Sequence, residues 1–382
     1  MLLAHSRCLN YHMLERGKIQ IMANAEKLKK FQEAIKSIDK NISKQYDTDG
    51  SITIFGDDPK DVEVISSGSI VLDDLLGGGL AKGRVIEIFG PEASGKTSLA
   101  LTAIGNVQKE GGTAAFIDLE NALDPRYAGV LGVDMDNLAI SQPTTGEEAL
   151  DMLEELVRSA AVDIIALDSI AALVPKAELE GTMEDQQMGT TAKLLGKGLR
   201  RILKPARENN CTVILINQLR EKVGFFMGSP EVTPGGKAPK YFASQRIDIR
   251  RIGQVTEPGS KSPIGTEVKI KIIKNKVAPP FREGKTVLTF AQGISKAAEL
   301  VEIGPKVGAI YMPTTRSWNH PVTHEKFAGS KAEALEALQT DEQLFNDIVQ
   351  YFSEIMAGQH DDEDAEIINE EDYEDAALEA AE

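Results

Sequence analysis

The sequence has few cysteines and no long apolar run. Cys8 and Cys211 are its only two cysteines, and Cys211 opens the apolar segment CTVILINQ, where a buried free thiol is favoured over a disulfide. No stretch approaches the roughly 18 uninterrupted apolar residues of a membrane helix, so a membrane span is excluded. The first residues, MLLAHSRCLN, hold an apolar block too short for a signal peptide. We therefore expect a soluble protein of a reducing cytoplasm.

The sequence also has fewer basic than acidic residues. There are 42 Lys and Arg against 59 Asp and Glu, a net charge of −17 that alone argues against a nucleic-acid-binding protein. Residues 359–382 hold twelve of these acidic residues and no Lys or Arg, so the rest of the chain is near −5. We interpret this block as a disordered acidic tail. It is either a solubilising tail or an autoinhibitory mimic of DNA.

The first part of the chain precedes the main domain. Residues 1–21 match no recognisable element, and Met22 looks like a more natural start. Residues 22–62 are predicted to form an arm of one helix and a short strand, in which SITIFG (51–56) alternates like a strand; a role of this arm in oligomerisation is implied only by the family resemblance given below. The arm's helix has one apolar stripe, which must be covered by its own domain or by a neighbouring chain. The stripe consists of Leu28, Phe31, Ile35, Ile38 and Ile42.

Residues 63–294 alternate apolar strands with helices, a pattern typical of a mostly parallel sheet flanked by helices. The predicted strands are RVIEIFG, TAAFIDLE, NLAISQP, VDIIALDS and CTVILINQ. After them, SQRIDIRRIGQV and GTEVKIKIIKNKV are expected to pair as a hairpin around TEPGSKSPIG, with a mobile tip. Residues 295–358 are predicted to form a small α+β domain. The fold class is therefore α/β.

The segment GPEASGKT fits the phosphate-binding pattern G-x-x-x-x-G-K-[ST] and lies between a strand and a helix. Its backbone N–H groups can close around phosphates, Lys96 can reach the β and γ positions, and Thr97 can hold Mg²⁺. In VDIIALDS the apolar residues Ile164 to Leu167 are followed by Asp168, at the sheet edge where ligands bind, and this carboxylate is expected in the outer coordination sphere of Mg²⁺. The expected nucleotide-binding loop comprises Gly90, Pro91, Glu92, Ala93, Ser94, Gly95, Lys96, Thr97 and Ser98.

Hydrolysis of a phosphoanhydride also needs a group that activates water. Glu120 ends the neighbouring strand segment and is our candidate. The alternative is a surface glutamate that caps the helix beginning near Leu123. Asn217 and Gln218 end CTVILINQ, where amide side chains could sense a γ-phosphate.

Six ordered segments between about Val64 and Gly293 closely resemble the bacterial RecA recombinases. They are GPEASGKT, FIDLENALDPRYAGVLGVD, ALDSIAALVPKAELEG, LINQLREKVG, TPGGKAPKYFASQRIDIRR and KIIKNKVAPPF. The resemblance implies a RecA-type ATPase core that uses ATP and Mg²⁺. It also implies helical self-assembly on single-stranded DNA, pairing with double-stranded DNA, and strand exchange in recombination and DNA repair. Some relatives also trigger repressor self-cleavage in the SOS response or use loader proteins, which these residues do not decide.

The resemblance also assigns roles to residues. It implies that Glu120 is the catalytic glutamate, that Gln218 couples nucleotide state to DNA binding, and that Asp124 and Tyr127 contact adenine. Lys274 and Lys276 of KNK resemble the pair that reaches a neighbouring protomer's γ-phosphate. Without the resemblance, KNK would be interpreted as an exposed strand end with two solvated lysines.

Two DNA loops are implied at Glu180 to Met188 and Leu219 to Gly236. Between them, basic residues recur on one face of a predicted helix, which is either a phosphate track or a solvated surface. The implied apolar wedges are Met188 and Val223, and the implied backbone donors are Gly235 and Gly236. The other expected DNA contacts are Lys193, Lys197, Arg200, Arg220, Lys222, Gly224 and Lys237. The chain departs from common family residues at Gly196 (often Ser), Glu221 (often Met) and Lys237 (often Asn).

Two rival functions share parts of this pattern. A ring-shaped helicase has the same ATPase core, but the KNK lysines stand where it would need an arginine finger. A nucleotide-gated scaffold would bind ATP without coupling its hydrolysis to DNA, and Glu120, Gln218 and both loops argue against it. His320 and His324 are four residues apart, but Pro321 interrupts any helix there, so a metal site is disfavoured.

Overall fold

The computed structural model describes residues 27–45, 62–181, 189–221, 231–256, 262–290 and 292–356. The chain divides into two units, residues 1–61 and 62–382. Several features predicted from the sequence lie wholly or largely outside the described residues: the extension at 1–21, the strand at 51–56, both DNA loops, the hairpin tip and the acidic tail. The proposed domain boundaries stay predictions.

In the first unit, residues 27–45 form a helix, as the apolar spacing predicts. Three residues of its apolar stripe are exposed: Leu28 at 56%, Phe31 at 55% and Ile38 at 46%. An apolar stripe left in water is unfavourable, so this helix needs a partner surface.

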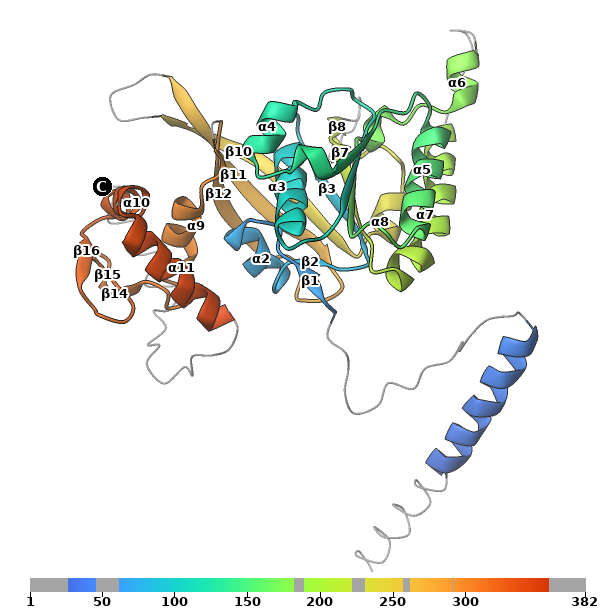
Figure 1. Ribbon diagram of the computed structural model, residues 1–382, viewed down its shortest axis with the longest axis horizontal. Coiled ribbons are helices and arrows are strands. Elements are labelled where there is room, and N and C mark those ends of the chain that lie inside the picture. Colours follow the sequence, from blue (N-terminus) through green and yellow to red (C-terminus); the bar gives the residue numbers. More distant parts are fainter. Residues whose placement is uncertain are drawn as a thin grey trace, which may run out of the picture. The chain divides into compact units, whose positions relative to one another are not determined.

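The second unit is built on a nine-stranded sheet with the order β13-β12-β11-β10-β3-β7-β6-β4-β5 (Figure 1). From β10 to β5 neighbouring strands are parallel, whereas β11, β12 and β13 extend the sheet in antiparallel fashion. Every strand predicted between residues 63 and 294 is present within a few residues. The strands are β3 (Val85–Gly90), β4 (Ala114–Asp118), β5 (Leu138–Ser141), β6 (Ile164–Asp168), β7 (Thr212–Gln218), β10 (Gln245–Thr256), β11 (Pro263–Asn275), β12 (Glu283–Thr289) and β13 (Gly293–Ile294).

Helices cover both faces of this sheet because successive strand residues point to opposite sides. In β6, Ile164 and Ala166 pack into one apolar cluster with α3 (Lys96–Lys109), whereas Ile165 and Leu167 pack into the other with α5 (Gly146–Arg158) and α7 (Thr190–Glu208). The two clusters form a three-layer core whose nucleotide-side edge is made by the carboxyl ends of the parallel strands.

The shorter elements surround this core. The remaining helices are α2 (Ile70–Leu76), α4 (Pro125–Val130), α6 (Lys176–Glu180), α8 (Ala238–Phe242), α9 (Lys296–Ile303), α10 (Lys331–Thr340) and α11 (Glu342–Met356), with 3-10 turns at Met135–Asn137 and Ile170–Ala172. The remaining strands are β1 (Val64–Ile65), β2 (Leu80–Ala81), β8 (Arg220–Glu221), β9 (Glu231–Val232), β14 (Tyr311–Thr314), β15 (Ser317–Asn319) and β16 (Lys326–Ala328). No described helix is long and apolar enough to cross a lipid bilayer.

Helix α9 is joined to the core by a buried carboxylate. Glu299 is fully buried and accepts hydrogen bonds from the Ser69 hydroxyl, from the Ile70 N–H at 2.7 Å and from the Thr286 hydroxyl at 2.7 Å. Burial raises its pKa to about 7 despite these bonds. The contact links α9 to the start of α2 and to β12. Trp318 of the small C-terminal sheet is 5% exposed, as expected of a packing residue.

Candidate functional site

The phosphate-binding loop connects β3 to α3, in the strand–loop–helix order that the motif predicts. Gly95, the N-cap of α3, has φ of 90°, and a Cβ atom there would lie 2.1 Å from a methyl carbon of Leu288. At Gly90 a Cβ atom would lie 2.0 Å from the carbonyl oxygen of Ile249. Only glycine fits these two positions. Larger residues at these positions would distort the loop. The first N–H groups of α3 point into this loop, where they can donate to phosphate oxygens.

Lys96, Thr97 and Asp168 meet at the first turn of α3. The Lys96 ammonium donates to the Pro91 carbonyl at 2.7 Å, and the Ser94 hydroxyl donates to the same carbonyl at 2.9 Å. Burial lowers the pKa of Lys96, and the charges of Asp168, Glu120 and Glu92 oppose this shift. The ammonium is thus held inside its own loop, where phosphate oxygens would replace the carbonyl.

Asp168 lies at the carboxyl end of β6 and is 7% exposed. It accepts a hydrogen bond of 2.5 Å from the Thr97 hydroxyl. Burial raises its pKa to about 6, and the Thr97 hydrogen bond partly offsets that rise. A hydroxyl and a carboxylate this close are hard oxygen ligands of the kind that Mg²⁺ prefers, so the donors fit the expected ion.

Glu120 receives two hydrogen bonds at one carboxylate oxygen. Gln218 donates from its side-chain amide at 2.8 Å, and Ser169 donates from its hydroxyl at 2.5 Å. The structure thus brings together Glu120 and Gln218, which are 98 residues apart in the chain. Ser169 had not been singled out from the sequence. Its position directly after Asp168 was the only available signal.

Asn217 does not face the nucleotide edge, contrary to one expectation from the sequence. It is fully buried, and its amide donates to Glu87 at 2.9 Å and to the Pro234 carbonyl at 3.2 Å. Side chains alternate along a strand, so Asn217 and Gln218 point to opposite faces of β7. Gln218 is the amide that contacts the catalytic candidate.

The two residues expected to contact adenine lie beside the loop on α4. Asp124 caps this helix, accepting from the Arg126 N–H at 2.8 Å, and is exposed. The Tyr127 hydroxyl lies 3.0 Å from the Ser98 hydroxyl on α3. Asp124 therefore has a structural role of its own, and its contact with adenine stays a prediction.

The described residues that are expected to contact DNA lie on α7, at the start of β8 and in the turn before α8. Gly235 and Gly236 have φ of 83° and 67° and pack against Leu195 and Ala192 of α7. Within the described part of the chain, their N–H groups have no hydrogen-bond acceptor. Met188, Lys222, Val223 and Gly224 lie outside the described residues, and Arg220 starts the short strand β8.

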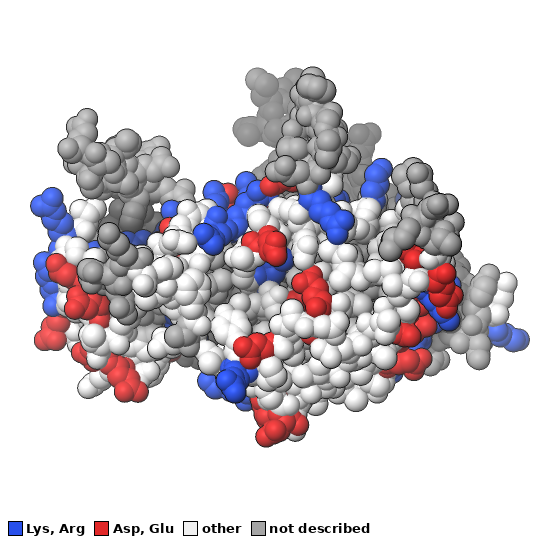
Figure 2. All heavy atoms as spheres, turned by 90° about the horizontal axis from the view of Figure 1, so that it is seen from above, with Lys and Arg blue, Asp and Glu red and all other residues white. Residues whose placement is uncertain are grey.

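The basic face of α7 is exposed, and its apolar residues Leu195, Leu199 and Ile202 are buried, as the spacing predicts. Lys193 and Lys197 form no ion pair with any described residue, Arg200 donates to the Gly196 carbonyl at 2.8 Å, and Lys237 is exposed. Figure 2 shows the molecule from above: Lys and Arg side chains gather mainly along one border, and Asp and Glu are scattered over the rest. Cations are thus available where the sequence predicts phosphate contacts.

Lys274 and Lys276 lie away from the phosphate-binding loop of their own chain. Lys274 pairs in register with Arg246, which pairs with Glu87, three residues before Gly90. The offset is about 10 Å along the strands and grows toward Lys276. The Lys274 ammonium donates to the Lys240 carbonyl at 2.8 Å, and burial lowers its pKa. Neither lysine is placed to serve the nucleotide site of its own protomer.

Other candidate chemistry is weak. Among the described residues, no group of three or more His, Cys, Asp or Glu could hold a metal ion. The His324 ring stacks on Tyr311, with centroids 4.4 Å apart. Cys211 is fully buried, and burial raises its pKa to about 12, so this thiol is unreactive.

Comparison with known proteins agrees with this geometry. The model of the RecA N-terminal domain matches residues 29–295. Protein RecA of Chloroherpeton thalassium is 47% identical over 335 residues, covering 87% of this chain and 91% of that protein. Protein RecA of Rippkaea orientalis is 51% identical over 291 residues, covering 76% and 82%. Protein RecA of Arthrospira platensis is 51% identical over 288 residues, covering 75% and 77%.

Among solved structures, the RadB recombinase matches with a TM-score of 0.47 and 24% identity, covering 60% of this chain and 98% of that one. The family evidence rests on the sequence matches, which span most of the chain at about half identity. This chain belongs to the RecA family and is a recombinase of DNA repair.

Proposed function

We propose that this protein is a DNA-dependent ATPase that assembles head to tail on single-stranded DNA and catalyses homologous pairing and strand exchange. One observation carries the proposal. Gln218 directly precedes the second DNA loop. Its side-chain amide donates a hydrogen bond of 2.8 Å to Glu120, which is the candidate for activating water. A change in that loop can therefore move a group that touches the catalytic carboxylate.

Each residue of the nucleotide site has a distinct part in hydrolysis. The loop N–H groups and Lys96 bind the phosphates, and Glu120 orients and deprotonates the attacking water. Thr97 and Asp168 would hold Mg²⁺, which neutralises charge on the β and γ oxygens when bound. Gln218 holds the Glu120 carboxylate and is released or engaged as the DNA loop changes.

The neighbouring protomer supplies the remaining positive charge. Lys274 and Lys276 lie toward the opposite end of the parallel strands from the phosphate-binding loop, so head-to-tail stacking brings them to the next protomer's site. Cations supplied in trans stabilise the charge that develops during phosphoryl transfer. Hydrolysis then requires assembly.

Two apolar surfaces among the described residues support assembly. The first is the exposed apolar stripe on the helix at residues 27–45. The second is an apolar pocket of about 370 Å³ beside the edge strand β5, lined by Ile140, Met152 and Leu156 among others. Because β5 is the last strand in the described sheet, one of its edges is open to a further strand. The N-terminal arm of an adjacent copy is the proposed occupant, and such a heterologous contact repeats into a helix.

On DNA, the N–H groups of Gly235 and Gly236 and the α7 cations bind phosphates. Met188 and Val223 are the proposed apolar wedges that unstack the strand and leave base edges free. Sequence specificity then comes from Watson–Crick pairing.

The test is the steady-state ATPase rate with Mg²⁺ at fixed salt, with and without single-stranded DNA. The proposal predicts strong stimulation by DNA in the full chain and its loss in Gln218→Ala, with ATP binding retained. A rate that DNA leaves unchanged in the unaltered protein would instead support a nucleotide-gated scaffold.

A further inference from the structure

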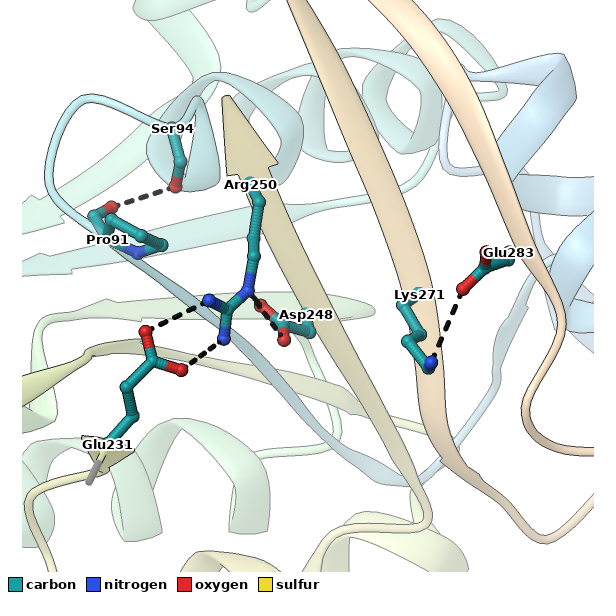
Figure 3. Close-up of polar contacts among 7 residues, drawn as sticks. All are labelled: Pro91, Ser94, Glu231, Asp248, Arg250, Lys271 and Glu283. Carbon is teal, nitrogen blue, oxygen red and sulfur yellow. Dashed lines mark hydrogen bonds and ion pairs between the residues drawn. The ribbon is translucent and has the colours of Figure 1, made fainter. Parts of the chain in front are cut away.

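Arg250 of β10 binds two carboxylates from different parts of the chain (Figure 3). Its two terminal nitrogens donate to the two carboxylate oxygens of Glu231, at 2.9 and 2.6 Å. Its Nε donates to both oxygens of Asp248, at 3.2 and 3.1 Å. All three nitrogens of the guanidinium are therefore engaged, which fixes the position of both partners.

Glu231 belongs to the stem of the second DNA loop. The stem consists of β8 and β9, in which Glu221 pairs with Glu231 and Arg220 pairs with Val232. Only Leu219 separates β8 from Gln218. One strand of the stem thus continues into the residue that contacts Glu120, and the other begins with the residue that Arg250 binds.

The other end of the cluster lies beside the phosphate-binding loop. Asp248 pairs in register with Phe89, the residue before Gly90. The carbonyl oxygen of Ile249 lies so close to Gly90 that no side chain fits there. Figure 3 shows the Arg250 guanidinium directed toward Glu231 and Asp248, with Pro91 and Ser94 of the loop drawn in the same view.

The electrostatics favour a fixed pair. The hydrogen bonds from Arg250 lower the pKa of Glu231, and Arg250 opposes the rise that burial causes in the pKa of Asp248. The chain also contains a control ion pair of similar exposure that does not involve the stem of the second DNA loop. In this pair Arg282 donates to the Asp74 carboxylate at 2.7 Å, and the side chains are 40% and 24% exposed. The corresponding exposures of Arg250 and Glu231 are 39% and 31%.

We propose that Arg250 is a positioning residue that clamps the stem of the second DNA loop to the nucleotide edge, so that DNA bound at the loop acts on Gln218 and Glu120. This role rests on the proposed function. Without the clamp, the loop still binds DNA, but its stem no longer holds Gln218 in a fixed relation to Glu120.

The test compares Arg250→Gln, Glu231→Gln and the double variant in the full chain. We expect each single change to lower the DNA-stimulated ATPase rate by about 10- to 100-fold, as misplacement of catalytic groups does. The double variant should be no worse than either single variant, because both remove the same clamp. Binding of a fluorescent ATP analogue should stay within about twofold of the unaltered protein, and Arg282→Gln should keep the stimulated rate.

A second readout separates positioning from direct DNA contact. If Arg250 bound a phosphate, Arg250→Gln would lower the salt slope of single-stranded DNA binding by about 0.7. We expect no change in slope. A lowered slope together with a normal rate in Glu231→Gln would overturn the clamp, as would normal stimulation in both single variants.

Two further controls keep the outcome interpretable. Arg250→Lys keeps the charge but loses the two-pronged contact, and should reproduce the loss if Arg250→Gln fails to fold. A lack of stimulation in the unaltered protein would overturn the proposed function itself, and the clamp with it. Failure of the proposed function can be distinguished from failure of the clamp alone, because it is seen in the unaltered protein without any variant.

Discussion

At the scale of single residues, Glu120 depends on two neighbours that the fold brings from distant strand ends. Ser169 follows β6 and Gln218 ends β7, and both donate to the same carboxylate oxygen. Within the described residues, the other carboxylate oxygen accepts no hydrogen bond, so it could bind a water molecule. A carboxylate held at one oxygen and available at the other is suited to orienting and deprotonating that water.

The first prediction concerns that carboxylate. Glu120→Gln keeps the side chain's size but removes the base, so the DNA-stimulated turnover should fall by about 100-fold or more. Binding of the ATP analogue should persist because the phosphate-binding loop is unchanged. Glu110→Gln, at the exposed end of α3, is the control and should keep its rate. Normal turnover in Glu120→Gln would exclude this residue as the base.

The second prediction uses two buried glycines in α7. A Cβ atom at Gly196 would meet Ala238 and Arg200 at 3.7 Å, an ordinary contact, whereas at Gly198 it would meet Leu150 at 2.9 Å. Gly196→Ala should raise the free energy of unfolding by about 0.5–1 kcal/mol, because helical glycine is unfavourable. Gly198→Ala should lower it by about 1–3 kcal/mol through overpacking. Urea denaturation of the two variants measures both, and equal effects would contradict the packing described for α7.

The third prediction is a pH dependence that originates at Glu299. Burial raises its pKa from 4.5 to about 7. The folded protein therefore keeps a proton that the unfolded chain releases, so this contribution is complete below pH 4.5 and is lost as the pH rises through 7. Glu299→Gln keeps the side chain neutral at every pH.

The measurement is the free energy of unfolding of both proteins at pH 5 and pH 8. The free energy of unfolding of Glu299→Gln minus that of the unaltered protein should increase by about 1–3 kcal/mol from pH 5 to pH 8. Taking this difference removes the shared contribution of Asp73, whose pKa burial raises to about 6. A difference that is constant with pH would mean that Glu299 does not titrate in this range.

At the scale of elements, α7 joins the hydrophobic core to the DNA side. Its buried face packs on α5 and the sheet, and its opposite face carries exposed cations that include Lys193, Lys197, Arg200 and Lys204. Lys204 near the end of the helix pairs with Glu208 at 3.4 Å, whereas Lys193 and Lys197 near its start form no ion pair within the described residues. The start of the helix is also where Gly235 and Gly236 pack. Only this half of the basic face is expected to bind phosphates.

The fourth prediction tests this division of the helix. Replacing Lys193 and Lys197 with Gln should weaken binding to single-stranded DNA and reduce its salt slope by about 1.4, for two lost phosphate contacts. Lys204→Gln is the control on the same helix and should leave the slope unchanged. Fluorescence anisotropy over a salt series measures both. Equal losses in the two proteins would indicate a diffuse charge effect instead.

Elements were more predictable from sequence than contacts. The strands β3, β4, β6 and β7 are continuous apolar runs, and the spacing of α7 separates buried from exposed residues, so local patterns identify them. Three hydrogen bonds show this: Arg250 to Glu231, Gln218 to Glu120 and Ser69 to Glu299 join residues that are 19, 98 and 230 positions apart. Such contacts depend on strand order and register, which no local pattern contains. The buried placement of Asn217 was missed for the same reason.

At the scale of the whole molecule, the residues of the proposed nucleotide site lie at two ends of the parallel strands. The phosphate-binding loop, Asp168 and Glu120 gather at the carboxyl ends of the parallel strands, whereas Lys274 and Lys276 lie toward the other end. Two further apolar surfaces among the described residues are the stripe at residues 27–45 and the pocket beside β5. Each of these features is accounted for if identical protomers stack head to tail.

The most direct test of this account mixes two inactive variants on single-stranded DNA. Glu120→Gln lacks the base but keeps the trans lysines, and Lys276→Ala has the opposite defect. In an equal mixture, about one interface in four pairs an intact Glu120 with an intact neighbouring lysine, so the ATPase should recover to about a quarter of the unaltered rate. A mixture no more active than its separate components would contradict a site shared between protomers.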